Sequence, residues 1–146
     1  MKKIAIVGSR VYDNKVAIKD FIFKIKNNFG LDTEIVSGGQ KDGADGFAKK
    51  YALEFGLKYV EFPPSHYNWN MHCKLPATKY NKPYYVSNYF KRNKQIAEYA
   101  DYIVAFIHKN SKTKGAMHTI KEAQKLNKKY LSLILISEPT RPNNIS

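Results

Sequence analysis

The sequence has a single cysteine, Cys73, among 146 residues. One thiol cannot form an intramolecular disulfide, so the fold has to rest on a hydrophobic core, and a reducing compartment is expected. No stretch approaches the roughly 20 apolar residues that cross a bilayer, and the first apolar run, Ile4-Ala5-Ile6-Val7, is too short for a signal peptide. These absences predict a cytoplasmic protein with no membrane partner.

Acidic residues are also scarce. There are 12 aspartates and glutamates against 25 lysines and arginines, which gives a formal net charge of +13. Such a field attracts phosphates, whether they belong to a free nucleotide or to a nucleic-acid backbone. Much of the charge is lysine on expected solvent faces, where it mainly keeps the protein soluble. The charge therefore leaves nucleotide and nucleic acid open as alternative partners.

Apolar runs of strand length alternate with amphipathic segments of helix length. This alternation predicts βαβ units, and so an α/β, Rossmann-like three-layer domain with a parallel sheet of about five strands. No linker or internal repeat divides residues 1–146, which we expect to form one domain. The expected strands are 4–7, 33–36, 59–62, 102–107 and 130–136, and the expected helices are 16–29, 44–55, 87–100 and 115–126.

The segment 64–86, called the aromatic loop below, interrupts this alternation. It has three prolines, Trp69 and several tyrosines, and it shows neither helical nor strand periodicity. A loop this long in a compact domain is usually functional or disordered, and the aromatic content argues against disorder. Its rings are expected either to stack on a base or to pack as a lid or dimer face. A polar tail occupies residues 137–146.

The first candidate ligand contact is the turn after the first strand, Gly8-Ser9-Arg10. In an open parallel sheet, ligands bind beyond the carboxyl ends of the strands. Glycine allows a close backbone approach, serine offers a hydroxyl, and arginine clamps a phosphate with two parallel hydrogen bonds. An ordinary strand-ending turn is the alternative.

The second candidate is the run Ser37-Gly38-Gly39-Gln40-Lys41-Asp42-Gly43-Ala44-Asp45. Glycines between a buried strand and a helix expose backbone amides beside the positive end of the helix dipole, which favours an anion. We expect Ser37, Gly38, Gly39 and Gly43 to bind ligand, while Asp45 either orients the helix or binds a ribose hydroxyl. A purely structural turn is the alternative.

Two further candidates follow. Arg92 and Asn93 stand side by side in the third expected helix, and they matter only if they point back toward the first two turns. After the fourth strand, Ser111, Thr113, Lys114 and Gly115 bring hydroxyls, charge and a glycine to the start of a helix. By the same dipole argument this is a second phosphate cradle, with a polar surface loop as the alternative.

In this order, the motifs resemble the SLOG superfamily, which groups DNA-processing DprA proteins with Lonely Guy phosphoribohydrolases. The resemblance covers residues 1–136 outside the aromatic loop, and it is to the small YspA-like, YAcAr-type proteins common in phages. It implies a nucleotide-binding domain that forms a homodimer or higher homo-oligomer. It places Gly8, Ser9 and Arg10 on the base or ribose side and Thr113 and Gly115 on the phosphate.

The resemblance also implies an enzymatic alternative. Lonely Guy hydrolases carry Pro-Gly-Gly-x-Gly-Thr-x-x-Glu, whose glutamate works with an arginine to break an N-glycosidic bond. Counting from Gly115, the glutamate position is Thr119, which cannot act as a carboxylate base. Glu122 lies one turn further along the helix, so the catalytic pair of an N-glycosidase would be Arg92 and Glu122.

These observations favour a protein that binds a small nucleotide or nucleotide-derived signal, such as a phage-encoded sensor or sequestering protein. A nucleoside-monophosphate N-glycosidase and a single-stranded nucleic-acid-binding module are the alternatives. Neither a cofactor nor a metal is expected. His66, His72 and Cys73 match no common zinc-site spacing, and a fourth ligand is missing from their surroundings in sequence.

Overall fold

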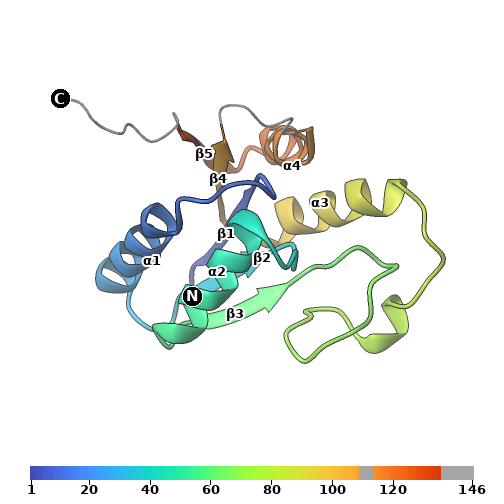
Figure 1. Cartoon of the computed structure of the whole chain (residues 1–146), viewed down its shortest axis with the longest axis horizontal. Helices are drawn as coiled ribbons and strands as arrows, with labels where there is room; N and C mark the ends of the chain where they lie inside the picture. The colour runs from blue at the N-terminus through green and yellow to red at the C-terminus, as the bar shows by residue number, and fades with distance from the viewer. Residues whose placement is uncertain (109–113, 136–146) are drawn as a thin grey trace.

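The computed structural model describes residues 1–108 and 114–135 (Figure 1). Every expected strand and helix is present, with each bound within one residue of its expected position. The elements are β1 (Lys3–Gly8), α1 (Lys15–Phe29), β2 (Glu34–Ser37), α2 (Gly43–Glu54), β3 (Lys58–Glu61), the 3-10 helix η1 (Ala77–Lys79), α3 (Ser87–Tyr99), β4 (Tyr102–His108), α4 (Lys114–Lys125) and β5 (Lys129–Leu135).

The five strands form one parallel sheet in the order β3-β2-β1-β4-β5. The central strand β1 pairs with β2 on one side and with β4 on the other. Helices cover both faces of the sheet, so the chain has the Rossmann-like three-layer α/β fold that the alternation of segments predicts (Figure 1).

Each central strand sends alternate side chains into two separate cores. Ile4 and Ile6 of β1 pack with α1 and α2 on one face, whereas Ala5 and Val7 pack with α3 and α4 on the other. A strand buried on both faces has no polar position, and this explains the continuous apolar run that begins the sequence. None of the helices in the described ranges is long and apolar enough to span a membrane.

The order in which strands are added to the sheet reverses at β1. The chain passes from β1 to β2 and β3 on one side, and then crosses back through α3 to place β4 on the opposite side of β1. The connections after β1 and β4 therefore diverge, which opens a crevice beyond the carboxyl ends of these two strands. The fold thus brings the end of β1, the start of α2, α3 and the start of α4 to one edge.

The aromatic loop is anchored at several points. Its backbone pairs with the sheet edge through Glu61, whose N–H donates to His72 O at 2.9 Å and whose carbonyl accepts from Lys74 N at 3.1 Å. His66 lies against Tyr84 and Tyr89 with ring centroids 4.7 and 5.2 Å apart. These contacts give the loop a defined path although most of it has no regular secondary structure.

Candidate functional site

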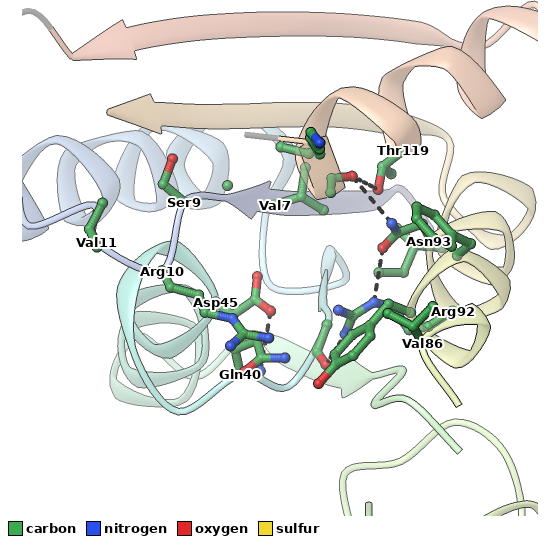
Figure 2. Close-up of a pocket in the computed structure, with 18 residues that line it drawn as sticks. Val7, Ser9, Arg10, Val11, Gln40, Asp45, Val86, Arg92, Asn93 and Thr119 are labelled. Carbon is green, nitrogen blue, oxygen red and sulfur yellow. Dashed lines mark hydrogen bonds between the residues drawn. The ribbon is translucent and has the colours of Figure 1, made fainter. Parts of the chain in front are cut away.

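A pocket of about 500 Å³ occupies the crevice beyond β1 and β4 (Figure 2). It collects residues from four segments that lie far apart in the sequence. Nine of the predicted ligand contacts line it: Gly8, Ser9, Arg10, Gly38, Asp45, Arg92, Asn93, Lys114 and Gly115. Ser37, Gly39 and Gly43 do not line it, and Ser111 and Thr113 lie outside the described residues.

Arg92 is the polar anchor of this pocket. Its side chain is only 8% exposed, and its Nη1 donates to the carbonyls of Gly38 at 2.5 Å and Phe62 at 3.3 Å. Nε donates to Asn93 Oδ1 at 3.0 Å. Burial lowers the pKa of the Arg92 guanidinium, while the Asp45 carboxylate acts in the opposite direction. Arg92 thus points back to the glycine turn and ties α3 to the ends of β2 and β3.

The glycine turn after β2 packs tightly against this arginine. A Cβ on Gly38 would lie 2.4 Å from Arg92 Nη1 and 2.7 Å from Asp45 Oδ2. The two following amides already have acceptors, since Gly39 N donates to Ser37 Oγ and Gln40 N to Asp45 Oδ2, both at 3.2 Å. This differs from the expectation of an open anion cradle. The physical reason is that the turn uses its amides to hold its own side chains.

Asp45 lies in the first turn of α2, 7% exposed, and it lines the pocket. Burial raises the pKa of its carboxyl to about 6, because desolvation outweighs the attraction of Arg92 and the hydrogen bond from Gln40 N. Among the charged residues that the structure describes, Asp45 is the only carboxylate in a lining that includes Arg10, Arg92 and Lys114.

The start of α4 forms the opposite end of the pocket. Asn93 Nδ2 donates to the Gly115 carbonyl at 3.2 Å, and this contact fixes α4 against α3. Lys114 is exposed, and no described residue has an atom within 4 Å of where a Cβ on Gly115 would stand. The first amides of a helix have no acceptor within the helix, so this end can receive an anion.

The two candidate carboxylate positions on α4 have different surroundings. Thr119 lines the pocket, and its hydroxyl donates to Gly115 O at 3.1 Å. Glu122 does not line it, but forms ion pairs with Lys125 at 3.0 Å and His118 at 3.7 Å. The Lys125 contact is the main cause that lowers the Glu122 pKa. The catalytic pair considered for a glycosidase, Arg92 and Glu122, is therefore not brought together in the pocket.

An apolar wall of the pocket was not predicted from the sequence. Val86, Tyr89 and Phe90 line it from the first turns of α3. Two guanidinium groups lie close to the Tyr89 ring, with Arg10 Cζ 5.7 Å and Arg92 Cζ 5.9 Å from its centroid. The signal that could have found them is their helical spacing relative to Asn93, because positions 86, 89, 90 and 93 share one face of a helix.

Behind the glycine turn lies a buried polar network on β2 and β3. Tyr59 OH is 2.6 Å from Ser37 Oγ and donates to Glu61 Oε1 at 2.8 Å. Asn70 of the aromatic loop donates to Glu61 Oε2 at 2.6 Å, and Lys49 pairs with Glu61 at 3.6 Å. Glu61 is 2% exposed, so these partners satisfy a carboxylate that would otherwise be very costly to bury.

Comparison with known proteins finds a family model that matches the N-terminal part of the chain. The model of the YspA, cpYpsA-related SLOG family matches residues 2–72, which span β1 to β3 and the first part of the aromatic loop. This is the resemblance that the motifs indicate. No curated protein matches the chain by sequence.

Solved structures share the fold over almost the whole chain. The molybdenum cofactor carrier protein of Chlamydomonas reinhardtii aligns with a TM-score of 0.62 and 17% identity, over 90% of this chain and 75% of that one. The molybdenum cofactor binding protein of Rippkaea orientalis aligns with a TM-score of 0.67 and 15% identity, over 91% and 76%. At these identities the similarity establishes the fold.

Proposed function

Because residues 2–72 match the model of a SLOG family, we propose that the pocket binds a small nucleotide or nucleotide-derived compound through a phosphate. The observation that carries this proposal is the charge of the pocket. Arg10, Arg92 and Lys114 line it against the single described carboxylate, Asp45. A concave site with such an excess of positive charge favours an anionic ligand.

The size of the pocket supports a small ligand. Its volume of about 500 Å³ lies within the range of roughly 300–1,000 Å³ that small-molecule sites occupy. A single-stranded nucleic acid would instead be expected to follow an extended basic groove with stacking platforms. The size therefore favours a mononucleotide-sized compound over the nucleic-acid alternative.

The two ends of the pocket suggest how the ligand lies. The phosphate fits best at the start of α4, where Lys114 is exposed and Gly115 leaves the backbone accessible. The remainder of the ligand then extends along Tyr89 toward Arg10 and Asp45. In this orientation the end with Lys114 binds the phosphate, and the end with Arg10 and Asp45 distinguishes one phosphorylated compound from another.

We propose that the ligand is bound and not hydrolysed. The position that carries the catalytic glutamate in Lonely Guy hydrolases is Thr119 here, and Glu122 lies outside the pocket. Binding without turnover suits a sensor, or a phage-encoded protein that sequesters a signalling nucleotide of its host.

Thermal unfolding in the presence of candidate ligands tests the proposal. The panel comprises nucleoside monophosphates, cyclic dinucleotides and ADP-ribose, together with the molybdenum cofactor that two similar folds bind. A ligand at 100 times its Kd adds about 2.7 kcal/mol to the free energy of unfolding, which raises Tm by several degrees. No shift with any phosphate ligand at millimolar concentration would contradict the proposal.

The alternatives have their own readouts. Release of free base from a nucleoside monophosphate, lost in Arg92→Ala, would make the protein an N-glycosidase. Binding of single-stranded DNA that falls steeply with salt, and that mononucleotides do not compete, would favour a nucleic-acid module. The homo-oligomeric state implied by the resemblance stays a prediction, which light scattering measures directly.

A further inference from the structure

One side chain in the pocket has unused hydrogen-bonding capacity. Among the described residues, Asp45 accepts a single hydrogen bond, from Gln40 N to Oδ2 at 3.2 Å, and forms no ion pair. A carboxylate offers about four lone-pair sites. Because Asp45 is 7% exposed and lines the pocket, donors for the remaining sites have to come from the ligand or from water.

Beside Asp45, Gln40 has a hydrogen-bond donor that lacks an acceptor among the described residues. Tyr67 OH donates to Gln40 Oε1 at 3.2 Å. Its Nε2 is buried and has no hydrogen-bond partner among the described residues. A buried donor without an acceptor costs about 1–3 kcal/mol. Figure 2 shows Asp45 and Gln40 together at one end of the pocket, with Arg10 beside them.

We infer that Asp45 and Gln40 recognise the 2-amino-4-oxopyrimidine edge of the ligand's heterocycle, the edge that guanine shares with pterins. This inference rests on the proposed function and names the ligand class. That edge carries two neighbouring donors, the amino group and a ring N–H, followed by a carbonyl acceptor. The donors match the Asp45 carboxylate. The carbonyl matches Gln40 Nε2, provided that the amide turns from its buried position into the pocket when the ligand binds.

The other common bases do not provide this pattern. Adenine places an acceptor where Asp45 needs a donor, and cytosine and uracil each offer only one donor on the corresponding edge. The site also presents flat surfaces for a planar ring, because Tyr89 and the Arg10 guanidinium lie at the same end. A ribose hydroxyl can donate to a carboxylate as well, and the experiment below separates the two readings.

Calorimetric titration of the whole chain with GMP, AMP, 2′-deoxy-GMP and a pterin monophosphate tests the inference. A bidentate contact of this kind discriminates against the wrong base by about tenfold or more. GMP is therefore expected to bind at least tenfold more tightly than AMP, and 2′-deoxy-GMP is expected to match GMP. The tighter of GMP and the pterin monophosphate shows which source of the shared edge the pocket prefers.

The variant Asp45→Asn makes the test specific to this residue. Its amide nitrogen repels the guanine amino group but donates to the 2-oxo group of xanthine. GMP affinity is expected to fall at least tenfold while xanthosine monophosphate affinity rises, and loss of structure alone cannot produce such an exchange. Asp42→Asn is the matched control, since Asp42 is exposed and its side chain makes no capping hydrogen bond.

The outcomes separate the two proposals. Equal affinity for GMP and AMP overturns the inference and leaves the phosphate site intact. A preference that follows the 2′-hydroxyl, or a GMP preference retained in Asp45→Asn, also overturns it. If no nucleotide or pterin phosphate binds, the proposed function itself fails.

Discussion

The starts of α2 and α4 are two glycine-containing helix N-termini at the same edge of the sheet, and the surroundings of their glycines differ. At α2, Gly38 is enclosed by Arg92 and Asp45, and the amides of Gly39 and Gln40 already have acceptors within the protein. At α4, Gly115 is exposed, and nothing in the part of the chain that the structure describes encloses it. The turn before α2 holds the buried side chains of Arg92 and Asp45 in place, whereas Gly115 at the start of α4 is exposed.

This difference changes how a glycine-rich turn is interpreted. The run from Ser37 to Asp45 has the stronger sequence signal, yet its glycines are needed for contacts within the protein. The buried Arg92 lies against Gly38, and the backbone of Ser9 and Arg10 lies against Gly43. The weaker signal around Gly115 marks the end at which we propose that the phosphate binds. Glycine between a strand and a helix therefore indicates a close approach, and the structure decides whether side chain or ligand makes it.

Gly38→Ala tests the enclosed turn before α2 and is expected to have the largest effect on stability. The new Cβ would overlap the Arg92 guanidinium and displace it from the Gly38 and Phe62 carbonyls. Overpacking together with lost buried hydrogen bonds is expected to lower the free energy of unfolding by about 3 kcal/mol. Chemical denaturation measures this. A loss below about 1 kcal/mol would mean that Arg92 relaxes freely.

Asp45→Asn is expected to stabilise the ligand-free protein by about 1–3 kcal/mol at pH 7.5. The pKa of Asp45 is raised from 3.8 to about 6, because burial outweighs Arg92, Arg10 and the Gln40 amide and Glu61 adds repulsion. The native state therefore holds the proton more tightly than the unfolded chain, and stability falls as pH rises from about 4 to 6.

The pH dependence makes the Asp45 test precise. The advantage of the variant over the wild type should be constant above about pH 7 and should shrink toward zero near pH 4. Denaturant unfolding at several pH values, with Asp42→Asn as the control, provides the comparison. An advantage that does not change with pH would show that charge burial is not its cause.

Gly115→Ala addresses the open end and has a smaller effect. Among residues 1–108 and 114–135, none has an atom within 4 Å of the new Cβ, and alanine is favoured over glycine in a helix by up to about 1 kcal/mol. The variant should be as stable as the wild type or slightly more stable, while the phosphate ligand binds less tightly. Unchanged affinity would place the phosphate elsewhere in the pocket.

Lys114→Ala is expected to have the smallest effect. The side chain is exposed, so its removal should leave Tm unchanged and weaken binding of a phosphate ligand only several-fold. The weakening should diminish as salt is added. Lys121→Ala, an exposed lysine on the same helix outside the pocket, is the control. Equal losses in both variants would indicate a general charge effect.

The elements of the fold follow closely from local patterns. The strand β1 is a short apolar run stopped by Gly8, and α1 begins where Asn14 Oδ1 accepts from Ala17 N at 3.2 Å. The start of α3 is less regular, because no side chain forms a capping hydrogen bond there and Asn88 donates instead to Pro83 O at 3.2 Å. Pro83 belongs to the aromatic loop, whose sequence shows no periodicity from which this contact could be predicted.

The site was predictable in outline and not in detail. The rule that ligands bind beyond the carboxyl ends of strands brings Arg10, Gly38 and Gly115 to one edge. The burial of Arg92 was not predictable, because its acceptors are backbone carbonyls of Gly38 and Phe62, which carry no residue-specific signal. The open capacity of Gln40 depends on Tyr67 in the aromatic loop and appears only in three dimensions.

The central position of β1 has a consequence for how the protein reaches its native state. Its first partner, β2, follows within about thirty residues, but its second partner, β4, is about a hundred residues further along the chain. During synthesis the N-terminal half has to wait with one long apolar strand edge unpaired, a state prone to association. Because β4 also positions the open helix end, the pocket is completed only in the last step of folding.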